Sequence, residues 1–274
     1  NKSRRSELPK AVLLVDVESN DAEKLKSACD QLLSRVHQYE CEGFIASDEN
    51  TREQFWKDRK NLGAIARHTN AFKLNEDVVI PIERLPDFAD YIEQLNCLKE
   101  LENNIGIADE LQKYLGSMIS EEDAYLGQKK EDLAGLIAGF KEQCNLLKNN
   151  IDRAGSGIAA LNINADDPRT VFSLIRDGAI KIHVDDLKNK INEMLHGYDE
   201  VKDTINEIIQ ENKSRQIIIA THMHAGDGNI HVNIPVHSNV YSMLQEAEDT
   251  AGRVMRETVR LGRSEEHTSE LQSR

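Results

Sequence analysis

The chain has 274 residues, which is long enough for one elaborated domain or two small domains with a hydrophobic core. Its 48 acidic residues outnumber its 34 basic residues, and the net charge of −14 disfavours binding to nucleic acids and to anionic membrane surfaces. The longest apolar runs are far shorter than the roughly 18 residues of a spanning helix, so we expect no transmembrane segment.

The two ends of the chain are set apart from the fold. Residues 1–10 carry neither an initiator Met nor a secretory signal, and we expect them to be the truncated lead-in of a longer protein. Residues 263–274, with the sequence RSEEHTSELQSR, resemble the translation of a sequencing adapter. We interpret them as a non-native tail, so the chain is expected to be a fragment whose readable native sequence stops at Gly262.

The first 96 residues predict an alternation of strands and helices. Three short apolar runs are typical of strands, namely 11–17, 43–46 and 78–80. Helical spacing of apolar residues predicts a helix after each of these runs, over 21–39, from Thr51 and from Pro86. The resulting order is strand and helix three times over.

A long region rich in Lys, Glu and Leu follows, over 97–214, and its spacing predicts a helical insertion. We interpret it as a solvated hairpin or small bundle, and the alternative is a partner-binding coiled coil. Strands at 216–223 and 229–234 and a closing helix over 240–261 are predicted next. The expected fold class is therefore α+β, a sheet-and-helix domain split by an all-helical insertion.

The domain organisation follows from this split. The first part of the sheet-and-helix domain is expected over 11–96, the insertion over 97–214 and the second part of the domain over 215–262. The four cysteines, Cys29, Cys41, Cys97 and Cys144, form no CxxC pair, which disfavours disulfides, structural zinc and an iron–sulfur cluster within the chain. A cytoplasmic protein is expected.

The most informative segment is THMHAGDGNIHVN, at 221–233, in which His224 and His231 bound a tight loop between two strands. The strand period of two places His231 and Asn233 on one face. Two neutral imidazoles suit a zinc-like or manganese-like divalent ion, with a carboxylate still needed. On spacing alone, structural hydrogen-bonded histidines are the alternative.

Other residues of this segment have simpler roles. Gly226 and Gly228 permit positive φ and a close approach of the backbone, and Asp227 can tie its own loop by hydrogen bonds. We interpret His222, like His183 and His237, as structural or exposed.

The motif HAGDGNIH resembles that of the C-terminal substrate-cap domain of FAD-linked oxidases, which include D-lactate, glycolate and D-2-hydroxyglutarate dehydrogenases. The runs FWKDR at 55–59, NEDVVIP at 75–81 and RLPDF at 84–88 resemble the same family in the same order. The resemblance implies a ferredoxin-like α+β cap domain. The helical insertion resembles that of a bacterial subgroup of large flavin and iron–sulfur dehydrogenases.

The resemblance also implies roles for single residues. His224 and His231 match metal ligands, and Asn229 matches a cofactor contact. Three residues match substrate-binding positions, namely Arg59, Lys73 and Asn233. Arg59 also lies on the apolar stripe of its helix, where a guanidinium needs an anion, although an arginine reaching from the stripe to a surface carboxylate is the alternative. We assign no catalytic residue, because Glu266 and His267 lie in the adapter-like tail.

The implied function is that of a flavin-dependent dehydrogenase that oxidises a small D-2-hydroxy acid, such as D-lactate, to a 2-oxo acid. Hydride would pass to FAD, which a domain before residue 1 would mostly bind. The resemblance also allows a divalent metal (Zn or Mn), an iron–sulfur cluster in a further C-terminal region, and peripheral association with the inner membrane. The fragment alone is expected to be inactive.

Two other classes of function are weighed against this one. A non-enzymatic helical scaffold would use 97–214 to bind partner helices, but it leaves the polar residues between the two strands unexplained. A metal-dependent hydrolase is disfavoured because no general-base carboxylate lies near the histidine pair in the sequence.

Overall fold

The computed structural model describes residues 12–62, 71–118, 124–237 and 239–262. The chain forms two compact units, residues 1–69 and 70–274. The predicted α+β class is confirmed, with a three-stranded antiparallel sheet and a helical insertion. The lead-in at 1–10 and the adapter-like tail at 263–274 lie outside the described residues. No helix in the described ranges is long and apolar enough to cross a membrane.

The first unit contains α1 (Ala22–Gln38) and α2 (Glu49–Leu62). Both helices begin at an aspartate whose carboxylate accepts hydrogen bonds from backbone N–H groups of the first turn. Asp21 accepts from Glu23 and Lys24, and Asp48 accepts from Thr51. The second helix therefore begins before Thr51, the residue that the sequence pattern had suggested as its cap.

The strands predicted over 11–17 and 43–46 are wrong for the residues that the structure describes, all of which are irregular there. A strand needs a neighbouring strand to hydrogen-bond with, and within the described ranges neither run forms β-pairing with another segment. Val12, Leu13 and Phe44 are accordingly exposed. An apolar run alone does not supply the pairing partner on which a strand depends.

The sheet of the second unit contains β1 (Ala71–Val79), β2 (Ala220–His224) and β3 (Asn229–His237), in the order β1–β3–β2. Side chains of β3 alternate between buried and half-buried along its whole length. The buried ones belong to Ile230, Val232, Ile234 and Val236. This alternation makes one face of the sheet apolar and leaves the other face polar.

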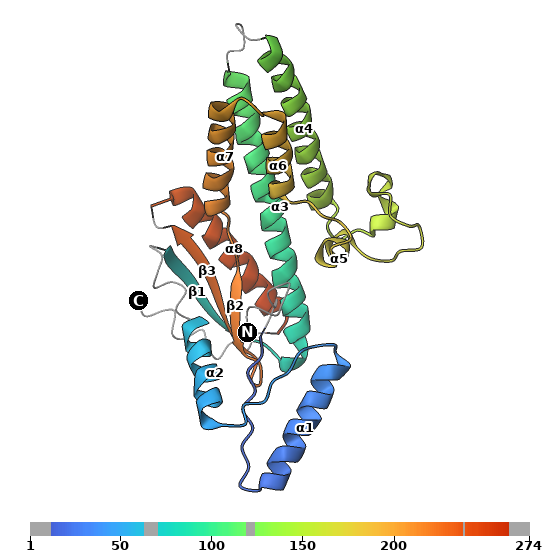
Figure 1. Cartoon of the computed structure of the whole chain (residues 1–274). Coiled ribbons are helices and arrows are strands. Elements are labelled where there is room, and N and C mark those ends of the chain that lie inside the picture. Colours follow the sequence, from blue (N-terminus) through green and yellow to red (C-terminus); the bar gives the residue numbers. More distant parts are fainter. Residues whose placement is uncertain (1–11, 63–70, 119–123, 238, 263–274) are drawn as a thin grey trace. The chain divides into compact units, whose positions relative to one another are not determined.

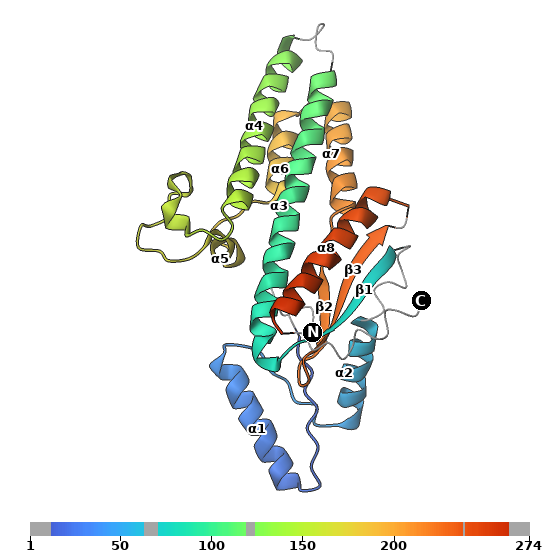
Figure 2. The same ribbon diagram turned by 180° about the vertical axis from the view of Figure 1, so that it is seen from behind.

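Two helices cover the apolar face of the sheet. They are α8 (Tyr241–Arg260) and the first turns of α3 (Leu85–Ser117), where Pro86 occupies the first turn as predicted. Figure 2 shows α8 lying alongside the three strands. Their core includes Phe88 and Leu95 from α3 and Ala247 and Val254 from α8, together with the buried residues of β3.

The helical insertion is built on the continuation of α3. This helix packs against α4 (Ala124–Asn149) and α7 (Asp199–Ser214), and α6 (Val184–Met194) packs against both of those (Figure 1). Between 97 and 214 the described residues contain helices and one isolated bridge, but no strand. Helix α3 passes residue 97 without a break, so the boundary predicted there lies within one helix. The predicted limits of the three parts stay predictions.

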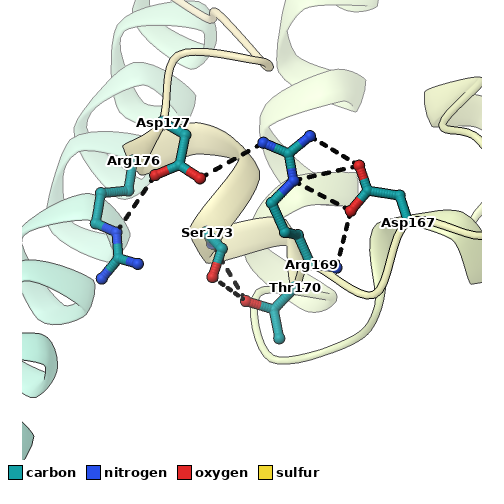
Figure 3. A network of polar contacts seen from close by, with 6 residues as sticks. All are labelled: Asp167, Arg169, Thr170, Ser173, Arg176 and Asp177. Atoms are coloured by element: carbon teal, nitrogen blue, oxygen red, sulfur yellow. Dashed lines mark hydrogen bonds and ion pairs between the residues drawn. The ribbon is translucent and has the colours of Figure 1, made fainter.

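The connection from α4 to α6 carries a short helix, α5 (Val171–Arg176), and a polar network beside it (Figure 3). Asp167 accepts hydrogen bonds from the backbone and the guanidinium of Arg169, and these bonds lower the pKa of its carboxyl. Arg169 also pairs with Asp177, and Thr170 caps α5 through the N–H of Ser173. The network fixes the loop's conformation, although its exposed ion pairs stabilise the fold little.

An ion-pair network around one buried lysine connects three helices. The side chain of Lys99 in α3 is 8% exposed, and its Nζ lies 3.0 Å from Glu102 and 3.1 Å from Glu246 of α8. Lys148 of α4 lies 3.1 Å from the other oxygen of Glu102. Burial acts to raise the pKa of Glu102, but hydrogen bonds from the two lysines outweigh burial and hold that pKa below its ordinary value. The ionised form of Glu102 is therefore favoured in the folded state.

We expect the Glu102 carboxylate to stabilise the fold above its unfolded-state pKa of about 4.3, and this contribution to be lost as the pH falls through the lower folded-state pKa. Glu102→Gln should lower the free energy of unfolding by about 1–3 kcal/mol at neutral pH. Its difference from the wild type should disappear under acid conditions, as measured by urea unfolding at several pH values. Glu100→Gln, an exposed neighbour on α3, is the control and should show neither effect. A constant difference between wild type and Glu102→Gln at every pH would contradict this expectation.

The loop between β2 and β3 depends on one of its two glycines. Gly228 has a φ of +74°, and its carbonyl oxygen accepts a hydrogen bond of 3.1 Å from the N–H of Ile80. A Cβ atom at Gly228 would collide with the carbonyl oxygen of Ile80, whereas one at Gly226 would meet no atom within 4 Å. Gly226 also has no positive φ, so the sequence expectation holds for Gly228 alone.

We expect Gly228→Ala to lower the free energy of unfolding by about 2–4 kcal/mol, because alanine adds left-handed strain and a collision with the backbone. Gly226→Ala, two residues away in the same loop, should change it by less than about 1 kcal/mol. Thermal or urea unfolding of both variants measures the difference. Equal stabilities of the two variants would show that the contact with Ile80 does not constrain the loop.

Candidate functional site

Three histidines lie together on the polar face of the sheet. In the pairing of β2 with β3, His222 lies opposite His231, and His224 lies opposite Asn229. Because alternate residues of a strand share a face, all three imidazoles project from the same side. Their ring centroids are 5.8 Å apart for His222–His231 and His224–His231, and 6.0 Å for His222–His224. The rings form a nearly equilateral triangle.

A carboxylate from the third strand contacts this triangle. Asp77 of β1 lies opposite His231 of β3, and its Oδ1 is 2.7 Å from the Nδ1 of that histidine. A carboxylate only accepts hydrogen bonds, so the Nδ1 of His231 carries the proton. One cross-strand row therefore contains Asp77, His231 and His222 in that order.

The predicted pair, His224 and His231, is brought together by the structure, but the sequence analysis missed their two neighbours. His222 was interpreted as structural or exposed, yet it belongs to the same cluster. The signal was its spacing of two from His224, which places both on one face of a strand. Asp77 had no such signal, because it lies 154 residues from His231 in the sequence.

The two predicted asparagines lie on the same face. Asn233 is half-buried, two residues from His231, and pairs with Ala220. The Oδ1 atom of Asn229 is buried and has no hydrogen-bond partner among the described residues. Buried polar atoms are nearly always paired in folded proteins, so this acceptor suits a donor supplied by a ligand or by water.

The side chains of Arg59 and Lys73 lie outside the described residues. The backbone of Arg59 belongs to α2 in the first unit, and the backbone of Lys73 pairs with Pro235 in the sheet of the second unit. The substrate-binding roles expected of Arg59 and Lys73 stay predictions.

The donors of the histidine cluster have the chemistry that a zinc-like cation prefers, since neutral imidazole nitrogens are common ligands of such ions. As the side chains stand, however, the described residues contain no group of three or more His, Cys, Asp or Glu placed to hold a metal ion. Side-chain rotation would be needed for the three rings to converge on one point. The cluster therefore fits a metal in the type of its donor atoms and in the closeness of its three rings.

The cysteines contribute nothing to this site. All four are free. Burial raises the pKa of Cys97 to about 11 and that of Cys144 to about 12, so both thiols stay protonated at neutral pH. A protonated thiol is a poor nucleophile and a poor metal ligand.

Comparison with protein families identifies the chain. The model of the family described as FAD linked oxidases, C-terminal domain, matches residues 3–101 and 184–268, which together exceed half of the chain. The first matched stretch contains Asp77, and the second contains the three histidines of the cluster. Searches among curated proteins and among solved structures gave no match. The extent of the family match shows that the chain belongs to the FAD linked oxidases, as a C-terminal domain of that family.

Proposed function

We propose that this chain is the substrate-cap part of a flavin-dependent dehydrogenase that oxidises a D-2-hydroxy acid, such as D-lactate, to the 2-oxo acid. Membership of the family supports a flavin-dependent oxidoreductase. The observation that carries the finer proposal is the cluster of three imidazoles and one carboxylate on the polar face of the sheet. Such a cluster suits the oxygen atoms of a hydroxy acid, directly or through a cation.

The substrate defines the tasks of the site. A 2-hydroxy acid presents a carboxylate and a neighbouring hydroxyl group, and its oxidation removes a proton from the oxygen and a hydride from the carbon. When bound, FAD supplies the hydride acceptor, and a zinc-like or manganese-like cation supplies the positive charge that polarises the hydroxyl group. The chain itself must bind and orient the substrate's polar groups and neutralise the charge of its carboxylate.

Each predicted residue takes one of these tasks in the proposal. His224 and His231 hold the cation through neutral ring nitrogens, and Asn233 orients the substrate by donating an amide hydrogen bond from the same face. Arg59 and Lys73 bind the carboxylate, which a chain with a net charge of −14 would otherwise repel. Asn229 offers its unpaired Oδ1 to the cofactor. The hydroxyl proton needs a base, and the proposal assigns none within the described residues.

The other predicted functions are less well supported. Asp77 places a carboxylate beside His231 in space, so the lack of one nearby in the sequence no longer counts against a hydrolase. Family membership, rather than the lack of a carboxylate, now favours the oxidoreductase over both the hydrolase and the helical scaffold. The iron–sulfur cluster, the cytoplasmic location and the attachment to the inner membrane stay predictions.

The test uses the complete flavoenzyme that carries this domain. We expect His224→Ala and His231→Ala each to remove bound zinc or manganese and to lower kcat/KM for D-lactate at least about 100-fold, because each substitution removes a ligand from the cation. Metal content is measured by elemental analysis, and turnover by anaerobic bleaching of the flavin. His237→Ala, on the same strand outside the cluster, is the control and should leave both unchanged.

Two outcomes would contradict the proposal. If both variants keep the metal and the wild-type kcat/KM, the histidines are structural. If the wild-type enzyme bleaches with none of a panel of D-2-hydroxy acids, the substrate class is wrong even where the metal is present.

A further inference from the structure

The contact between Asp77 and His231 determines which nitrogen of the imidazole is available. The two ring nitrogens point in different directions, so a partner bound to Nδ1 on one side of the ring leaves Nε2 available to a ligand on the opposite side. Here Nδ1 binds the carboxylate on β1, while the rings of His222 and His224 lie on β2, with centroids 5.8 Å from that of His231. The order β1–β3–β2 places the carboxylate and the two other imidazoles on opposite sides of His231.

The tautomer of the neutral ring follows from the same contact. Because the carboxylate accepts the hydrogen of Nδ1, the neutral ring carries its lone pair on Nε2. An imidazole without such a partner exchanges between its two tautomers. A metal-ligating histidine commonly donates its second N–H to a carboxylate, which fixes the tautomer and the ring orientation.

We propose that Asp77 is a positioning residue, which holds His231 in the Nδ1–H tautomer and turns its Nε2 towards the β2 histidines as a donor to a divalent cation. The cation rests on the proposed function, whereas the effect of Asp77 on the tautomer does not. Asp77 acts through His231 and does not itself ligate the cation. Its side chain is 72% exposed, compared with 37% for the imidazole, and its Oδ1 is already engaged by the Nδ1 of His231.

The backbone around the pair supports this role. Asp77 lies opposite His231 only in the observed register, because a slip by one residue would place Glu76 or Val78 there and turn the carboxylate to the apolar face. The hydrogen bond from the N–H of Ile80 to the carbonyl of Gly228 closes the end of the same ladder. The carboxylate of Asp77 is thus positioned by the pairing of β1 with β3, which Gly228 helps to fix.

The first test measures the tautomer in the metal-free 274-residue chain. Long-range proton–nitrogen NMR of ¹⁵N-histidine-labelled protein distinguishes Nδ1–H from Nε2–H, and the His231 signals are assigned by their loss in His231→Gln. We expect Nδ1–H in the wild type, conversion to a mixture or to Nε2–H in Asp77→Ala, and partial retention in Asp77→Asn, whose amide oxygen still accepts. Glu83→Gln, which removes one exposed negative charge after β1, is the control and should match the wild type.

The second test measures the affinity of the same proteins for Co²⁺ and Zn²⁺ by titration. We expect Asp77→Ala to weaken binding by about 10–100-fold, and Glu83→Gln to leave it unchanged. The proposal is overturned if His231 keeps its Nδ1–H tautomer in Asp77→Ala, or if wild type and Asp77→Ala both bind the cation with the same affinity. If the tautomer differs between wild type and Asp77→Ala but neither protein binds either ion, the positioning role is supported and the metal site of the proposed function is overturned, so the two failures are distinguishable.

Discussion

The pairing of β3 with a strand on each side is the constraint on which the rest of the second unit depends. Because side chains alternate along a strand, the register sends Ile230, Val232 and Ile234 towards the helices and His231 and Asn233 to the polar face. The same register brings the apolar residues of β1 and β2 into one core. Hydrophobic burial therefore fixes the positions of the polar side chains, because their own exposed contacts contribute much less to the free energy of folding.

The site that results is assembled from segments far apart in the chain. Asp77 precedes the helical insertion, and the histidines follow it, so neither segment makes the cluster alone. The insertion does not disturb the sheet, because its bundle has a separate core that includes Ile107, Leu111 and Ile191. The buried Lys99 connects the two regions through Glu102 and Glu246. Because the ammonium of Lys99 is buried, removing a glutamate partner would leave a buried charge with fewer compensating groups.

Sequence patterns were sufficient where the deciding interactions are local. Helical spacing and end residues gave α1, α8 and the start of α3 to within a few residues, and the motif brought His224 and His231 to one site. Sequence patterns failed where the structure of a segment depends on a partner far away in the chain. The runs 11–17 and 43–46 have strand composition but are paired with no strand within the described residues, and Asp77 joins the cluster only through the pairing of β1 with β3. His222 was within reach, because its spacing from His224 is local.

Helix α3 has a mechanical consequence for the domain. Its 33 residues extend for about 50 Å, and the same rigid rod supplies Phe88 and Leu95 to the core beneath the sheet and Ile107 and Leu111 to the core of the bundle. Because α3 belongs to both cores, unfolding of either core would expose part of this shared helix to water. The bundle and the layer that supports the histidines are therefore joined by one continuous helix, so a displacement of α3 in one core changes the packing of the other.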